Sequence, residues 1–230
     1  MVTKNITKSV KAIIDNDLSF QDAMQRQYCN LSAIARIIKP SMDTIAGTDV
    51  SVESIVTALK RTSKDYRVPY ASVEPIVAGS KISLRTDVAK LSIVKNKKTI
   101  EKIAKPLTVH YDSFISVSES VNSMTLIFDQ LILEKMKSMF DDDDTLEVES
   151  NLAAIIVQSP QDIIKTPGCA LIFYNQLARR HVNIEDTISC YTDTIMLVNM
   201  NDVAKAFNAL TELITESRKS LGKAKSTSRH

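Results

Sequence analysis

The sequence predicts an α+β protein, with a helical N-terminal module followed by two antiparallel sheet units. Three observations support this. Apolar residues recur at helical spacing through residues 1–67. After Ile82 the pattern changes to strand-like alternation in ISLRTDVAKLSIV. The order strand, helix, strand, strand, helix then occurs twice, at a spacing of about 70 residues. This order indicates ferredoxin-like βαββαβ units, each with both helices on one face of its sheet.

The helical module is predicted from apolar stripes at i, i+3, i+4 spacing. The stripes are at Ile6–Ile14, Leu31–Ile38 and Val52–Leu59, with a further short helix over Phe20–Gln27. Asn30 and Ser51 are placed to cap the second and third stripes, because their side chains can accept hydrogen bonds from first-turn N–H groups. Pro40 is expected to end the second helix.

The remaining boundaries follow from turn residues and from changes of period. The predicted segments are a linker at 68–81, a first unit at 82–150, a second unit at 151–215 and a tail at 216–230. Prolines and a glycine mark the linker. The basic tail has no apolar period and is expected to be disordered. No final strand is visible after Ile214, so a neighbouring unit or another chain would complete the second sheet.

Composition excludes several classes of protein. Hydrophobic residues make up 44% of the 230-residue chain and charged residues 24%, which is typical of a globular protein. No apolar run reaches the length of a membrane span, and no secretory signal is visible, so a cytoplasmic protein is expected. The net charge of +2 does not mark a nucleic-acid binder, although residues 1–67 carry ten Lys/Arg against seven Asp/Glu.

Motifs for catalysis, metals and cofactors are not found in the sequence. There is no Gly-rich phosphate loop and no nucleophile elbow, so no enzyme activity and no cofactor are predicted. The cysteines are widely spaced, and no Cys/His cluster has zinc-site spacing. The acidic run Asp141–Asp144 lacks the glycine and the distal glutamate of a calcium loop. We expect it to be a solvated loop.

A family resemblance is carried by TPGCALIFYNQLARRHVNIEDTISCYTDTIMLV, which begins at Thr166. It resembles the ACT fold in the form found in the regulatory part of aspartokinases. The shared features are Pro167-Gly168 before a helix, apolar positions along that helix, Asn183-Ile184 after it, and the apolar run Ile195–Val198. The match covers Leu152–Thr215. Residues 82–150 resemble an ACT unit only in the order of elements, without the Pro-Gly and Asn-Ile motifs.

The resemblance implies an amino-acid site between paired ACT units, and therefore a homodimer or a higher oligomer. The residues that it implies for ligand binding are Thr166, Pro167, Gly168, Asn183, Ile184 and Ser189. The physical chemistry agrees, because a glycine permits close approach and N–H groups at a helix start attract a carboxylate. An alternative stays open: the Pro-Gly can be an ordinary helix start and the asparagine an ordinary turn residue, serving packing and dimerisation alone.

The N-terminal module resembles a helix-turn-helix or winged-helix module, as in archaeal proteins that join such a module to ACT units. The resemblance is carried by NLSAIARIIKP and SVESIVTALKR, with the second as recognition helix. The residues that would contact DNA are Ser54, Thr57, Lys60, Arg61 and Lys64. The alternative is a helical oligomerisation or docking domain with a solvated polar face.

Two functions follow from these expectations. The first is a transcriptional regulator of amino-acid metabolism, which binds DNA through its helical module and senses an amino acid through tandem ACT units. The second is a stand-alone regulatory subunit that docks on a metabolic enzyme without binding DNA. Neither a membrane nor a metal is an expected partner in either case.

Overall fold

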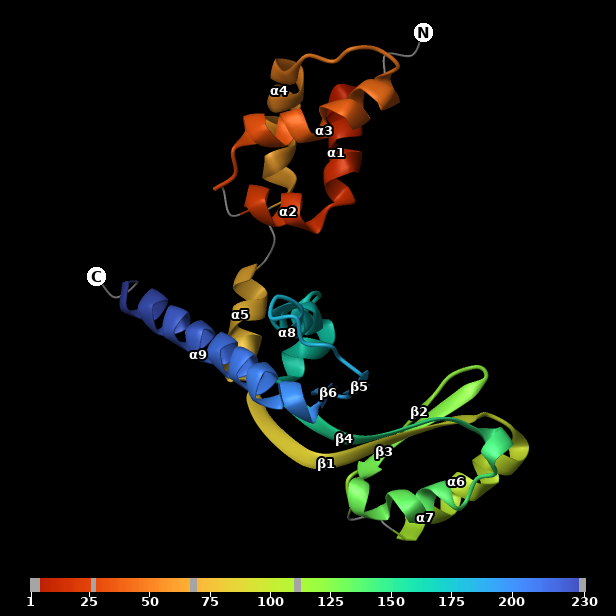
Figure 1. Ribbon diagram of the computed structural model, residues 1–230. Coiled ribbons are helices and arrows are strands. Elements are labelled where there is room, and N and C mark those ends of the chain that lie inside the picture. Colours follow the sequence, from red (N-terminus) through yellow and green to blue (C-terminus); the bar gives the residue numbers. More distant parts are fainter. Residues whose placement is uncertain (1–4, 26–27, 67–69, 110–112, 228–230) are drawn as a thin grey trace. The chain divides into compact units, whose positions relative to one another are not determined.

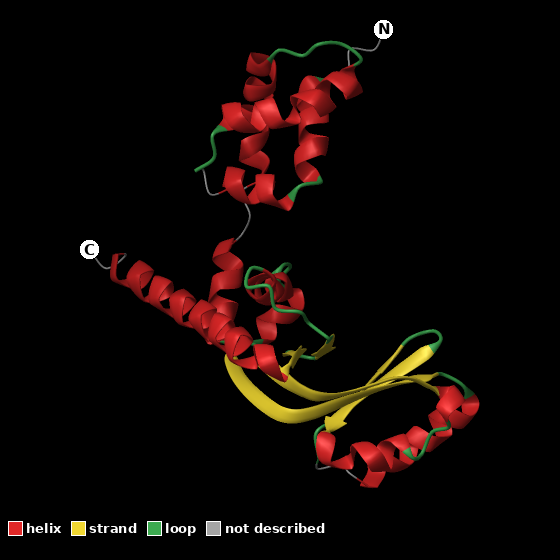
Figure 2. Cartoon of the chain, viewed as in Figure 1, coloured by secondary structure: helices red, strands yellow, loops and turns green. Residues whose placement is uncertain are grey.

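The computed structural model describes residues 5–25, 28–66, 70–109 and 113–227 (Figure 1). Its contacts divide the chain into two compact units, Met1–Tyr70 and Ala71–His230. The first is helical, and the second combines helices with an antiparallel sheet, as Figure 2 shows. The predicted α+β class is confirmed. Each unit is described by itself below.

The helical unit contains α1 (Ile6–Asp15), α2 (Leu18–Gln25), α3 (Leu31–Ala46), α4 (Val52–Thr62) and the 3₁₀ turn η1 (Ser63–Tyr66). The predicted caps are confirmed: Asn30 accepts a hydrogen bond from Ala33 N–H, and Ser51 accepts one from Ser54 N–H. The buried side chains form one cluster: Val10, Ile14, Met24, Ile34, Ala35, Ile38, Met42, Val50, Ile55, Ala58 and Leu59. Residues 5–25 and 28–66 include no strand, so they contain no β wing.

The sequence predicted that this helix ends at Pro40, but helix α3 continues to Ala46. A proline costs a helix one hydrogen bond, and here the bond is lost on an exposed surface. The apolar stripe continues past it, because Ile38 and Met42 are both buried in the core. Gly47, with φ of 70°, ends the helix in the left-handed conformation that glycine adopts without strain.

A charged cluster holds the turn between α3 and α4. The ammonium of Lys39 contacts Asp43 at 2.9 Å and Asp49 at 2.5 Å, and it donates to the carbonyl of Val50 at 3.0 Å. Asp43 in turn accepts from Val50 N–H at 2.8 Å. The hydrogen bond from Lys39, followed by that from Val50, lowers the pKa of Asp43. The turn is therefore tied to α3 by side chains on both ends of the connection.

The predicted linker at 68–81 is wrong over most of its length. Helix α5 (Tyr70–Gly79) and the start of strand β1 (Lys81–Val94) occupy it. Apolar side chains at Val73, Ile76 and Val77 are buried in the core of the sheet unit. Gly79 marks the end of α5, Pro75 lies inside the helix, and Pro69 lies outside the described residues.

One antiparallel sheet forms the centre of the second unit. Its strands are β1, β2 (Ile115–Glu119), β3 (Ser123–Asp129), β4 (Thr145–Gln158), β5 (Asp186–Cys190) and β6 (Asp193–Asn199). Their order is β2-β3-β1-β4-β6-β5. The long strands β1 and β4 lie side by side in the middle, and the short strands β2 and β5 form the two edges (Figure 1).

The two βαββαβ units share the two long strands. The C-terminal half of β1, 88–94, pairs with β3, and its other neighbour is the N-terminal half of β4. The C-terminal half of β4, 152–158, pairs with β6, and its other neighbour is the N-terminal half of β1. Each long strand is thus the first strand of one unit and the fourth strand of the other. The strand missing after Ile214 is supplied by this chain itself.

Matching geometry in the two repeats supports this assignment. Val88 pairs with Asp129 in the first repeat, and Leu152 pairs with Asn199 in the second. Asp129 accepts from Leu131 N–H, and Asn199 accepts from Asn201 N–H, each at 3.0 Å. The residue before each long-strand half has a left-handed backbone, with φ of 57° at 87 and 60° at 151. The repeat predicted from element order is therefore present in the backbone.

The helices of the sheet unit form two groups (Figure 1). Helices α6 (Lys97–Val109) and α7 (Leu133–Lys137) pack on the first repeat, around Leu91, Ile103, Phe128 and Met136. Helices α8 (Cys169–Ala178) and α9 (Val203–Thr227) pack with α5 on the second repeat, around Phe173 and Leu210. A further buried cluster, from alternate strand positions, includes Val88, Ile127, Leu152, Ala154, Ile195 and Leu197.

Two segments are more ordered than predicted: the basic tail, expected to be disordered, and the acidic run, expected to be a solvated loop. Helix α9 continues to Thr227, so disorder from 216 is wrong up to that residue, and 228–230 lie outside the described residues. Arg218 ties the helix down by donating to the carbonyls of Ala78 and Ser80, each at 2.8 Å. The acidic run also has partners, because the Asp144 carboxylate lies 3.3 Å from the Lys98 ammonium and is only 14% exposed.

Candidate functional site

The first group of predicted ligand residues lies at the start of α8. Gly168 is the N-cap, with φ of 88° and no side chain to bond the first-turn N–H groups. A Cβ added there would meet no atom within 4 Å, so the space beside this backbone is open. Pro167 and Gly168 are exposed, and the Thr166 hydroxyl donates to the Asp162 carbonyl at 2.8 Å. An anion could reach the start of this helix without displacing a side chain.

Ser189 lies at the same end of the sheet. It is exposed on edge strand β5 and pairs with Thr194, close to where β4 ends and leads into α8. The sequence reasoning missed two neighbours, since the Gln161 amide donates to the Tyr191 hydroxyl at 2.7 Å across this end. Neither residue type carries a local signal, because the contact joins two loops that are distant in sequence.

Asn183 and Ile184 lie away from the first group. They follow the C-terminal end of α8, which has ten residues and is therefore about 15 Å long. Asn183 is exposed, whereas Ile184 is half-buried against the core of the second repeat. The structure therefore brings Thr166, Pro167, Gly168 and Ser189 to one end of α8 and leaves the Asn-Ile pair at the other end.

The corresponding helix start in the first repeat is already satisfied. Asn96 caps α6 by accepting from Thr99 N–H at 2.9 Å, and its amide donates to Asp144 at 3.0 Å. The acidic run meets the first turn of this helix through Lys98, which contacts both Asp141 and Asp144. The hydrogen bond from Lys98, followed by the charge of Lys102, lowers the pKa of Asp141. Of the two equivalent helix starts, only that of α8 has a glycine cap and open space.

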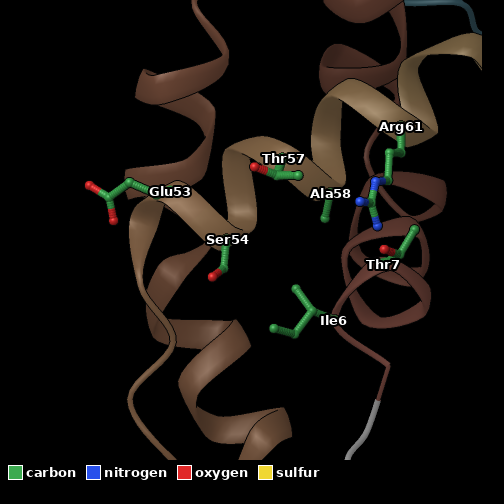
Figure 3. Close-up of a pocket in the computed structure, with 7 residues that line it drawn as sticks. All are labelled: Ile6, Thr7, Glu53, Ser54, Thr57, Ala58 and Arg61. Carbon is green, nitrogen blue, oxygen red and sulfur yellow. The ribbon is translucent and has the colours of Figure 1, made fainter.

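The helical unit contains a cavity of about 330 Å³ between α1 and α4, shown in Figure 3. It is lined by Ile6, Thr7, Glu53, Ser54, Thr57, Ala58 and Arg61. Three of the predicted DNA contacts, Ser54, Thr57 and Arg61, therefore lie together. The other two, Lys60 and Lys64, are exposed and do not line the cavity. The polar face of α4 is thus partly walled by the start of α1.

Metal and membrane signals are absent from the described residues. Within 5–25, 28–66, 70–109 and 113–227, no three His, Cys, Asp or Glu residues are grouped as metal ligands. In the same ranges no helix combines the length and the apolar character that a bilayer crossing requires.

Comparison with known proteins gives likeness of fold. No protein-family model matches the sequence, and no curated protein matches it. Aspartate kinase from Synechocystis aligns with a TM-score of 0.50 and 17% identity, over 60% of this chain and 27% of that chain. The ligand-free regulatory subunit of aspartate kinase from Thermus thermophilus aligns with a TM-score of 0.49 and 11% identity, over 57% of this chain and 95% of that chain. Clostridium acetobutylicum aspartate kinase aligns with a TM-score of 0.47 and 21% identity, over 58% of this chain and 34% of that chain.

The Synechocystis likeness supports the fold of the sheet unit. The helical unit is too short to supply 60% of the chain, so the aligned part must include the sheet unit. This chain spans 34% of the Clostridium enzyme and 27% of the Synechocystis enzyme. The helix-turn-helix interpretation of the first unit stays a prediction.

Proposed function

We propose that this chain is a regulatory protein that senses an amino acid through its sheet unit. The observation that carries the proposal is the start of α8, where Gly168 leaves the helix uncapped and the adjacent space open. An uncapped helix start attracts a carboxylate through its free N–H groups and the helix dipole.

In this proposal the ligand lies between two copies of the chain. A carboxylate binds at Thr166–Gly168, with Ser189 on the same side of the sheet. Asn183 is too far along α8 to reach the same ligand, so the Asn-Ile contact comes from a second copy. Asparagine suits this role because its amide both donates and accepts hydrogen bonds, as the two charged ends of an amino acid require.

The ligand half of the proposal is tested by thermal unfolding of the full chain with each of the twenty amino acids. A ligand at a hundred times its Kd stabilises the folded state by about 2.7 kcal/mol. We expect one amino acid to raise the unfolding temperature, and Asn183→Ala to remove most of that rise. Asn122→Ala, at an exposed asparagine in the turn between β2 and β3 of the first repeat, is the control and should keep it. No shift with any of the twenty would refute the proposal.

We further propose that the helical unit transmits the signal by binding DNA, which makes the protein a transcriptional regulator. The support is a set of cations on and after α4, since Lys60, Arg61 and Lys64 are all exposed. Phosphate contacts release counterions, so affinity for a DNA duplex should fall steeply with salt. A fluorescent duplex titrated at several salt concentrations measures this. Absent or salt-insensitive binding would refute the DNA role.

The second candidate is docking on a metabolic enzyme. It is favoured by the walled face of α4, where Glu53 and the start of α1 flank the predicted contacts. A carboxylate repels DNA phosphates, and a concave surface suits a protein side chain better than a duplex groove. Sedimentation of the full chain with a candidate amino-acid biosynthetic enzyme, with and without the ligand found above, distinguishes this role. A ligand-dependent complex without DNA binding supports docking.

A further inference from the structure

We propose that the cavity between α1 and α4 is a binding site for a small oxyanion, a carboxylate or phosphate group, held by Arg61. The site lies in the helical unit and is separate from the α8 end of the sheet unit. Arg61 lines the cavity, and Figure 3 shows its side chain extending from α4 so that the guanidinium lies beside Thr7 of α1. Two units of one chain would then each carry a ligand site.

The cation of Arg61 is not used by the fold. Within the described ranges it forms no ion pair, although many other cations of the chain do. Glu53, the carboxylate among the residues that line the cavity, lies two turns away on α4, which is about 12 Å along the axis. In Figure 3 the Glu53 side chain points away from Arg61 and Thr7. The guanidinium is therefore available to an incoming anion.

The other walls of the cavity suit a small organic anion. The Thr7 hydroxyl can donate to an oxyanion, as a guanidinium does through its parallel N–H groups, whereas the Ser54 hydroxyl already shares a hydrogen bond of 2.9 Å with the Ser51 hydroxyl. Ile6 and Ala58 add apolar surface beside them. The volume of about 330 Å³ lies at the lower end of ligand pockets, so the group is a small metabolite or a single phosphate.

The backbone at the start of α1 does not supply this site. The Asn5 side chain already accepts from Thr7 N–H at 3.0 Å and from Lys8 N–H at 3.4 Å. Anion binding would consequently depend on side chains, above all on Arg61. This dependence makes the proposal testable by single substitutions, and it separates a pocket from a general basic surface.

Lys60 is the matched control, because it is the neighbouring cation on α4, exposed and outside the cavity. A DNA backbone is read by surface charge, so Lys60→Gln and Arg61→Gln should weaken DNA binding comparably. The affinity for an oxyanion in the cavity should differ between these two variants. Arg61→Gln should weaken anion binding about tenfold or more, because a charge-assisted hydrogen bond is lost. Lys60→Gln should change it by less than about twofold.

The experiment uses the full chain, with inorganic phosphate and acetate as separate probes at constant ionic strength, and sodium chloride as reference. Binding is followed by NMR shifts of the α1 and α4 amides. We expect saturable shifts with at least one probe, lost in Arg61→Gln and kept in Lys60→Gln. Thr7→Val, which removes a hydroxyl and keeps the shape, should weaken binding even if the arginine variant folds poorly. Shifts that are absent, unsaturable, or equal in both charge variants would overturn the proposal.

Discussion

Gly168 offers a sharp test of how the start of α8 is built. The perturbation is Gly168→Ala, which adds one methyl group at a residue with φ of 88°. The methyl would meet no atom within 4 Å, so no packing clash contributes to the effect. The cost is therefore the left-handed backbone alone, which is about 1–2 kcal/mol for a residue with a Cβ.

That free energy corresponds to a fall in the unfolding temperature of the sheet unit of about 2–4 °C per kcal/mol. Differential scanning calorimetry of the full chain measures it. Gly168→Asn should cost less than alanine, because asparagine tolerates the left-handed region. The matched control is Gly47→Ala, at φ of 70° with equally open space, which should destabilise the helical unit by a similar amount.

Two results would refute this reasoning. A loss far above about 2 kcal/mol in Gly168→Ala would mean that the methyl group meets atoms and that the site is closed. No loss at all would mean that the residue does not keep its left-handed conformation. The first result would also remove the open space on which the amino-acid proposal depends.

Three further predictions concern stability. Asp129→Asn should leave the free energy of unfolding nearly unchanged, because the second repeat uses asparagine for the same cap. Asp129→Ala should lower that free energy by about 1 kcal/mol, as measured by chemical denaturation. Lowering the pH through the depressed pKa of Asp43 should destabilise the helical unit, because this carboxylate contributes stability only while charged. Thermal melts at a series of pH values measure this effect, and the pH dependence should become flatter in Asp43→Asn or on loss of Lys39. Phe173→Ala should cost about 3–5 kcal/mol at a fully buried site, against little for Leu171→Ala on the exposed face of the same helix.

Much of the local structure could be predicted because it depends on neighbours along the chain. The caps at Asn30 and Ser51 and the helical stripes of α1, α3 and α4 follow from side chains within a few residues of each other. Errors arose where tertiary packing outweighed a local signal. Burial of Met42 carries α3 past Pro40, and contacts of Arg218 accompany a helical tail that has no apolar period of its own.

The candidate site was predictable only in part, for the same reason. The Pro-Gly at the head of α8 is a local motif, and the sequence located it. The contact between Gln161 and Tyr191 joins two loops, and the roughly 15 Å between Gly168 and Asn183 depends on the course of the helix. The cavity of Arg61 likewise needs two helices that are distant in sequence.

Apart from α5 and the end of α9, the sequence by itself determined the elements, their order and the twofold repeat, because periodicity and capping are local properties of the chain. The tertiary structure alone decided which strand completes each sheet. Strand periodicity shows that one face of β1 is apolar, but it does not specify which partner its free edge will meet. Only the folded chain shows that β1 and β4 each serve both repeats, which makes the two repeats one inseparable sheet.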